Sequence, residues 1–146
     1  MISYYFEDTD FIFKGKTLNN RWLKLVAESE IRRIGDISII FCSDNYILDV
    51  NQKYLQHDYF TDIITFDYSN LDEGFISGDI YIDYQTVADN AKIYGTTAAR
   101  EMLRVVVHGV LHLCGQGDKT PETEAVMHSK EDKYLELFTA KFAPKK

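Results

Sequence analysis

The feature that most constrains the fold is a helical segment over residues 97–113 that is apolar on almost every side. Thr96 or Thr97 is a suitable N-cap for it, and Gly115 follows its last turn. A helix that is apolar nearly all round is buried by other elements and does not lie on the surface. Its apolar residues are Met102, Leu103, Val105, Val106, Val107, Val110, Leu111 and Leu113.

The remaining segments predict a mixture of strands and helices. We expect strands at 2–6, 37–42, 62–68 and 78–83, and further helices at 19–33, 44–55, 85–94 and 122–142, the first of them closed by Gly35. The predicted fold class is α+β, a small mixed sheet of about four strands packed with helices. The helix over 97–113 is then expected to be buried against the sheet. With no linker or repeat, residues 1–146 are expected to form a single domain.

Composition narrows the class of protein. The chain is 45% hydrophobic, which suffices for a core, but no apolar run approaches the roughly 20 residues that span a bilayer. We expect no signal peptide, no membrane partner and a cytoplasmic location, with Cys42 and Cys114 as buried reduced thiols. The net charge of -7 argues against a generic nucleic-acid binder, which needs clustered lysine and arginine.

The central helix carries two histidines with the spacing of metal ligands. His108 and His112 are four residues apart, so their imidazoles lie about 40° apart on one helical face. The chain can turn at Gly115 and return with Asp118. Two nitrogens and one carboxylate oxygen form a tripod for one Zn²⁺ per chain with an open fourth position. A metal-bound water there is the predicted nucleophile of a hydrolytic reaction. The helix over 97–113 is thus predicted to be a zincin-like metal helix, and residues 1–146 a single metal-dependent hydrolase domain.

Each of these residues also has a simpler interpretation. A histidine pair on a helix is often polar surface, and Asp118 could be a turn residue or the N-cap of the helix at Pro121. The metal is favoured because two buried imidazoles without partners would be costly. Gly109 stands where the H-E-x-x-H motif of zinc peptidases has its glutamate, which argues against a metallopeptidase.

The segment HGVLHLCGQGD resembles the signature H-G-x-L-H-L-x-G-x-D-H of the YbeY family of endoribonucleases. Upstream, NQKYLQHDYFTDIITF at 51–66 resembles the family stretch N-x-x-Y-R-x-x-D-x-x-T-N/D-V-L-S-F, and a G-D-I strand begins at Gly78. The resemblance covers about 49–134 in the family's order. The signature positions that match are His108, Gly109, Leu111, His112, Leu113 and Gly115.

The resemblance implies an activity and partners. It implies a metal-dependent single-strand endoribonuclease that acts in 16S ribosomal RNA 3′-end maturation and ribosome quality control. Its partners would be ribosomal RNA and the small ribosomal subunit; the oligomeric state is not indicated. Thr61 and Asp62 match the family's T-N/D and are predicted to line the substrate cleft, although they could equally cap the start of a strand.

Two departures from the family pattern affect the predicted chemistry. Asp118 stands where the family has its third metal histidine, and Leu55 replaces an arginine that is implicated in activity. Arg104, one turn before His108, is the candidate substitute for binding phosphate, and its alternative is an ion pair with Glu101. The competing function is a ribosome-assembly or RNA-binding factor with a mainly structural metal, and a metallopeptidase comes third.

Overall fold

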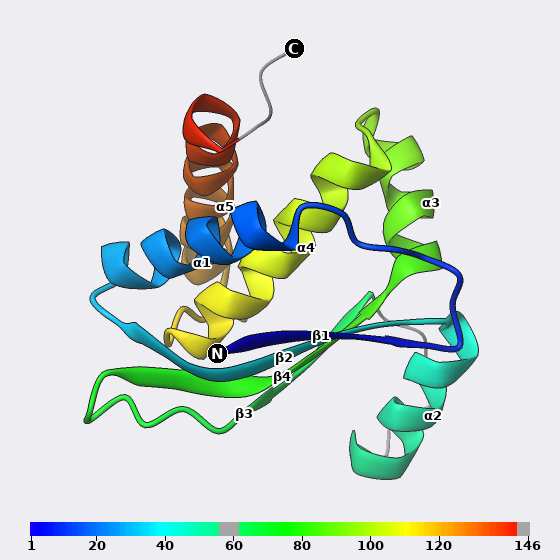
Figure 1. Cartoon of the computed structure of the whole chain (residues 1–146), viewed down its shortest axis with the longest axis horizontal. Coiled ribbons are helices and arrows are strands. Elements are labelled where there is room, and N and C mark those ends of the chain that lie inside the picture. The colour runs from blue at the N-terminus through cyan, green and yellow to red at the C-terminus, as the bar shows by residue number, and fades with distance from the viewer. Residues whose placement is uncertain (56–61, 143–146) are drawn as a thin grey trace.

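The computed structural model describes residues 1–55 and 62–142, apart from the side chain of Leu55. In this part of the chain, strands form one sheet and helices pack on both of its faces (Figure 1). The elements are β1 (Ile2–Glu7), α1 (Lys16–Ser29), β2 (Arg33–Cys42), α2 (Asp44–Leu55), β3 (Ile63–Asp67), β4 (Phe75–Asp83), α3 (Tyr84–Tyr94), α4 (Ala98–Leu113) and α5 (Pro121–Lys141).

The sheet is mixed and has four strands in the order β1-β2-β4-β3. The first three strands of this order are parallel, and β3 runs antiparallel to β4 at the edge. Ile39 in β2 lies between Tyr4 of β1 and Ile80 of β4, and Ile80 in turn pairs with Thr65 of β3. The predicted α+β fold with a small mixed sheet is therefore confirmed.

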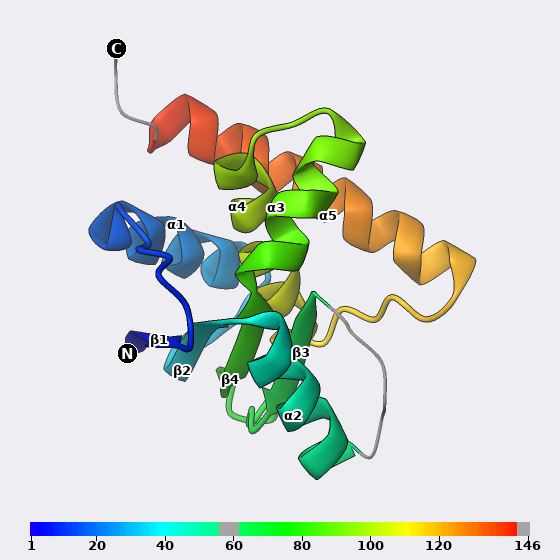
Figure 2. The ribbon, with the colours of Figure 1, turned by 90° about the vertical axis from the view of Figure 1, so that its right-hand side faces the viewer.

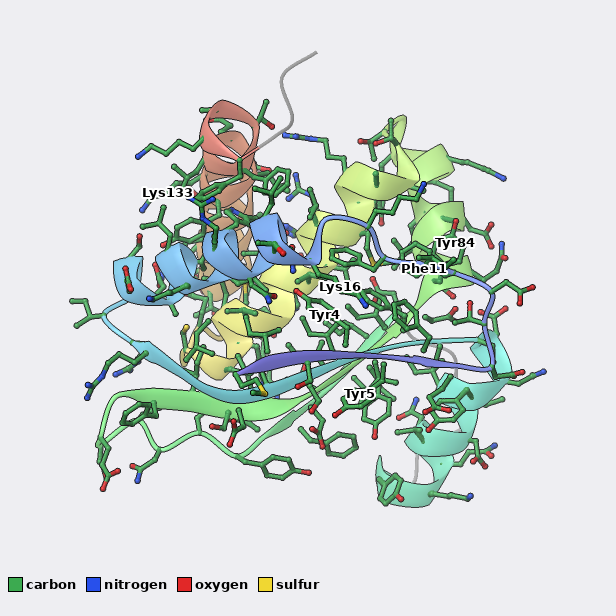
Figure 3. The ribbon with its side chains drawn as sticks, in the orientation of Figure 1. Tyr4, Tyr5, Phe11, Lys16, Tyr84 and Lys133 are labelled. Carbon is green, nitrogen blue, oxygen red and sulfur yellow. The ribbon has the colours of Figure 1, made fainter. Side chains whose placement is uncertain are left out.

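The two faces of the sheet carry cores of different size. Side chains alternate along a strand, so Tyr4 and Tyr5 point to opposite faces (Figure 3). The face of Tyr4, Ile39 and Ile80 packs under α1, α4 and α5 and holds the larger core (Figure 1). α2 covers part of the other face, where Ile64 belongs to a smaller cluster (Figure 2).

Helix α4 lies at the centre of the larger core, as predicted. Thr97 caps its first turn by accepting a hydrogen bond from the Arg100 backbone N–H at 3.1 Å. Val106, Val110 and Leu111 are fully buried, and full burial of an aliphatic side chain of this size contributes about 1.5–3 kcal/mol. Packing on several sides therefore fixes the position of any polar group on this helix.

Glycines allow α4 to lie directly on the sheet. A Cβ at Gly109 would come within 3.0 Å of Ile80 and 3.1 Å of Ile63. A Cβ at Gly78 in β4 would collide with the backbone oxygen of Phe66 and lie 2.8 Å from Leu113. One side of α4 is thus pressed against β3 and β4, and position 109 faces the sheet.

The first helix differs from its predicted bounds. We expected residues 19–33 closed by Gly35, but α1 begins at Lys16 and ends at Ser29. The chain leaves the helix through Ile31, whose φ is +60°, while the Arg32 backbone N–H donates to Ala27 O at 2.8 Å. Left-handed geometry at a β-branched residue is rare, so the pattern gave no reason to expect it. Gly35 lies inside β2 instead.

The hairpin of β3 and β4 is also longer than predicted. β4 begins at Phe75 and not at Gly78, and an antiparallel bridge joins Phe75 to Asn70. Between the expected strands at 62–68 and 78–83, Asn70 and residues 75–77 are therefore paired, and residues 71–74 form the turn. Cys42 and Cys114 are free and buried, as predicted, and burial raises the pKa of each thiol to about 12. No helix in the described ranges is both long and apolar enough to cross a bilayer.

Two neighbouring carboxyl groups, buried Asp83 and half-buried Asp44, lie at the end of the sheet where β4 meets α3. Asp83 is fully buried and caps α3 by accepting from the Thr86 backbone N–H at 3.3 Å. The Thr86 hydroxyl lies 2.8 Å from Asp83 Oδ2 and 3.3 Å from Asp44 Oδ1. Burial, together with the neighbouring Asp44 carboxyl, raises the pKa of Asp83 to about 7. Asp83 therefore keeps its proton in the folded protein as long as the pH stays below about 7.

Replacing Asp83 by asparagine should change how stability depends on pH. The pKa of Asp83 is 3.8 when unperturbed and about 7 when folded, so the folded state binds the extra proton between these values. Stability from this group is complete below pH 3.8 and is lost as pH rises through 7. Asp83→Asn keeps a good N-cap and cannot ionise. We therefore expect the variant to gain free energy of unfolding over the wild type at pH 8. This gain should exceed the corresponding change at pH 4 by on the order of 1–3 kcal/mol.

Urea denaturation at the two pH values would measure this difference. Asp72→Asn, at an exposed turn position, is the control and should not alter the pH dependence. An Asp83→Asn variant whose effect is the same at both pH values would contradict the explanation.

Candidate active site

One cavity of about 850 Å³ brings together most of the residues that the sequence singled out. His108 and His112 on α4 line it, and so does Asp118 in the segment between α4 and α5. Asp62, directly before β3, and Arg104 complete this part of the wall. Figure 2 shows the segment between α4 and α5 emerging beside β3. Thr61, the other predicted cleft residue, lies outside the described residues.

The polar residues of α4 form a single ridge along the cavity. Arg104, His108 and His112 follow one another at intervals of four residues, each about 40° further round the helix. Gly109 lies about 100° from His108 and faces Ile80 in the sheet. A glutamate at this position would be directed into the core and not into the cavity. The base of the peptidase motif therefore has no place here.

His108 is held at both of its ring nitrogens. Nδ1 lies 2.7 Å from Glu131 Oε2 on α5, and Nε2 lies 3.3 Å from Asp118 Oδ2. A carboxylate that accepts from one ring nitrogen fixes the orientation and tautomer of the imidazole, as in the outer shell of many metal sites. Nε2 is thereby directed at the predicted third ligand.

The predicted ligands line one wall, but they do not surround a common point. Within residues 1–55 and 62–142, no group of three or more histidine, cysteine, aspartate or glutamate side chains is arranged to hold a metal ion. The zinc site therefore stays a prediction. The proposed N-cap role of Asp118 is wrong, because Thr120 caps α5 and shares a capping box with Thr123.

The electrostatics of His108 and Glu131 are coupled. Burial alone would lower the pKa of His108, but the hydrogen bond and charge of Glu131, with Asp118 and Asp62, raise it above its usual value. Burial would likewise raise the pKa of Glu131, but His108 and Arg104 hold it below its usual value. The pair thus favours an ionised Glu131 beside a histidine that readily accepts a proton.

Arg104 uses its charge within the protein. Its Nη1 donates to Glu131 Oε1 at 3.0 Å, and its Nη2 donates to Asp132 Oδ1 at 2.6 Å. Its Nε lies 3.8 Å from Glu101 Oε1, which confirms the ion pair expected as the alternative role. Binding of phosphate by Arg104 stays a prediction, and three carboxylates already compete for this guanidinium.

Asp62 lines the cavity at the start of β3. Burial raises the pKa of its carboxyl, while backbone hydrogen bonds at residues 62 and 63 and the nearby His108 act in the opposite direction. These backbone contacts agree with the capping alternative. Lining of the cavity and capping of the strand are therefore both features of this one side chain.

Sequence reasoning missed Glu131, the acidic residue closest to His108. Most of the charged residues of α5 are exposed, yet Glu131 is only 2% exposed. A signal was available: Glu131 lies four residues after Met127 and four before Leu135, both buried. A charge on the apolar stripe of an amphipathic helix must find a partner. His128 is 60% exposed but borders the cavity, and its Nδ1 lies 3.5 Å from Glu131 Oε1.

Comparison with known proteins confirms the family that the sequence motifs resemble. The family model described as Endoribonuclease YbeY matches residues 5–139. The chain is 46% identical over 136 residues to Endoribonuclease YbeY of Parabacteroides distasonis, covering 93% of this chain and 94% of that protein. It is 47% identical over 141 residues to Endoribonuclease YbeY of Flavobacterium psychrophilum, covering 97% and 99%.

A solved structure shares the fold. The solution structure of TM1509 from Thermotoga maritima superposes with a TM-score of 0.65 at 29% sequence identity, covering 96% of this chain and 91% of that one. The relatives named above are endoribonucleases, which are hydrolytic enzymes that cut phosphodiester bonds. With the model match over residues 5–139, the chain belongs to the endoribonuclease YbeY family.

Proposed function

We propose that this chain is a metal-dependent single-strand endoribonuclease that acts in 16S ribosomal RNA 3′-end maturation and in ribosome quality control. Its partners would be ribosomal RNA and the small ribosomal subunit, and its location the cytoplasm. The observation that carries the proposal is the placement of His108, His112 and Asp118 on one cavity in a chain of this family.

The chemistry of the three side chains fits zinc. His108 and His112 offer ring nitrogens and Asp118 offers a carboxylate oxygen, a set that occurs in catalytic zinc sites. Two of these donors are already 3.3 Å apart. When bound, the ion would polarise a phosphoryl oxygen and lower the pKa of a water molecule to about 7.

The protein's own contribution would be orientation. Glu131 holds the ring of His108, and Arg104 in turn holds Glu131 at 3.0 Å. Ile63 and Thr65 on the edge strand β3 form the facing wall of the cavity. An RNA strand between β3 and the α4 ridge would place a phosphate against the histidines.

The metal content of the purified protein should depend on Asp118. Removing one of three ligands leaves two imidazoles, so we expect Asp118→Ala to hold much less than one zinc per chain. Inductively coupled plasma mass spectrometry after dialysis measures this. Asp89→Ala, an exposed position on α3, is the control and should match the wild type. Full zinc occupancy in Asp118→Ala would remove Asp118 from the ligand set.

Glu131→Gln should weaken zinc binding without removing a ligand. The amide keeps the size of the side chain but loses the charge that orients His108, and loss of such a partner typically costs 10–100-fold in metal affinity. Competition titration with a zinc chelator measures the change. Asp132→Asn removes the neighbouring carboxylate on the same helix and should have little effect. If Glu131→Gln bound zinc as tightly as the control Asp132→Asn, Glu131 would not support the site.

Nuclease activity should fall strongly when His112 is replaced by alanine. Loss of a metal ligand removes a Lewis acid worth several kcal/mol, so we expect His112→Ala to cut at least about 100-fold more slowly. The assay uses a precursor fragment that carries the 3′ end of 16S ribosomal RNA, with and without zinc. His128→Ala is the control, since His128 borders the cavity but is not a predicted ligand.

The same assay tests the competing function. Leu55 replaces the family's arginine, and Arg104 is engaged by carboxylates, so an assembly or RNA-binding factor with a structural metal would fit these two observations. For such a protein, wild type and His112→Ala would cleave equally, and that result would sink the nuclease proposal.

A further inference from the structure

One end of the cavity lies beyond the predicted metal ligands and has no role so far. It is formed where α3 ends and α4 begins, by Asn90, Tyr94, Thr96 and Arg100. It is continuous with the histidine end, because all these residues line the same cavity of about 850 Å³. A substrate that extends from the histidines along α4 would reach it.

Arg100 differs from Arg104 in having its charge available. Its side chain is exposed, and Nη1 makes a 3.3 Å hydrogen bond to the neutral hydroxyl of Thr139. In the described part of the chain, no carboxylate lies within 4.0 Å of it, whereas Arg104 has three. Of the two arginines on the cavity wall, Arg100 is therefore the one whose guanidinium can bind an external phosphate.

Tyr94 supplies an exposed aromatic surface beside this charge. It is the last residue of α3, where Gly95 turns the chain with φ +70°, and it is 68% exposed. Among the described residues, its ring stacks on no other aromatic ring and its hydroxyl has no hydrogen-bond partner. An exposed ring on a cavity wall can stack on an unpaired base, which contributes about 1–3 kcal/mol per base in single-strand binding proteins.

The separation of the two ends fits a short stretch of single strand. Arg100 and His108 are eight residues apart on α4, which corresponds to about 12 Å along the helix axis. Phosphates of a stacked strand rise about 3.4 Å per nucleotide, so this distance spans about three nucleotides.

We propose that Tyr94 and Arg100 form a second RNA subsite, in which Tyr94 stacks on an unpaired base and Arg100 binds a phosphate about three nucleotides from the bond that is cut. The subsite rests on the proposed endoribonuclease function and adds a reason for a single-stranded substrate, because a paired base cannot stack on a side chain in this way. It also assigns the phosphate contact to Arg100 and not to Arg104.

The test is binding of a short 2′-O-methyl single strand to the zinc-loaded full chain, measured by fluorescence anisotropy, with gel electrophoresis showing that the strand stays intact during the titration. Tyr94→Ala should bind about 5- to 100-fold more weakly, the loss expected for one stacked base. Arg100→Gln should lower the slope of log affinity against log salt by about 0.7, as expected for one lost phosphate contact. An abasic nucleotide about three positions from the cleavage site should weaken wild type but not Tyr94→Ala.

Matched controls are available on the same chain. Tyr68 is 65% exposed and does not line the cavity, so Tyr68→Ala should bind like the wild type. Arg21 is an exposed arginine on α1, so Arg21→Gln should leave the salt slope unchanged. Unchanged affinity and slope in the Tyr94 and Arg100 variants, or equal losses in the controls, would overturn the subsite.

Cleavage kinetics separate this proposal from the function on which it rests. Weaker cleavage by Tyr94→Ala should appear in KM and not in kcat, because the subsite lies away from the reacting phosphate. A wild type that binds the strand through Tyr94 but cuts no RNA would leave the subsite standing and refute the nuclease. A wild type that cuts RNA while both variants keep a normal KM would refute the subsite and leave the nuclease standing. A wild type that neither binds the strand nor cuts RNA would refute both.

Discussion

The buried carboxylate of Glu131 is the interaction on which the arrangement of the site depends. At 2% exposure an ionised carboxylate is tolerated only with partners, and Glu131 has His108 at 2.7 Å and Arg104 at 3.0 Å. Both partners lie on α4, so the charge joins α5 to α4 across the rim of the cavity. Removal of one partner from a buried pair typically costs about 3–5 kcal/mol, so the three side chains behave as one unit. The orientation of His108 therefore follows from a structural requirement of helix packing.

The contact between α4 and the sheet determines the direction in which His108 and His112 face. Gly109 approaches Ile80 so closely that its side of the helix must face β4. Because successive residues on a helix are about 100° apart, this contact turns His108 and His112 toward the cavity. The absence of a side chain at position 109 is thus what gives the histidines their direction. The same contact leaves no room for a glutamate at position 109. A glycine at this position is therefore required by the packing of the helix and does not argue against a hydrolytic site on it.

Some features of the site and fold could be predicted from the sequence, and others could not. His108 and His112 could be placed on one face because their spacing is local and the surrounding helix is apolar. The burial of Glu131 had a local signal, but its pairing with His108 could not be predicted, because that contact depends on α5 packing against α4 at a separation of 23 residues. The end of α1 was misplaced because Ile31 adopts a left-handed turn that usually requires glycine, while Gly35 lies within a strand. Local periodicity therefore predicted the ridge of the site, and tertiary packing decided which charges complete it.

A divalent cation in the cavity would offset the negative charge that opposes RNA binding there. Four carboxylates and two arginines line its wall, so with neutral histidines the wall carries a net charge of about -2. A phosphate strand would be repelled by this wall alone. A divalent cation at the proposed ligands would bring the wall to about neutrality, and Arg104 would remain bound to its own carboxylates. Arg100 would then be the cavity's uncompensated positive group. Metal binding and RNA binding would in that case favour one another, because each relieves the charge that opposes the other.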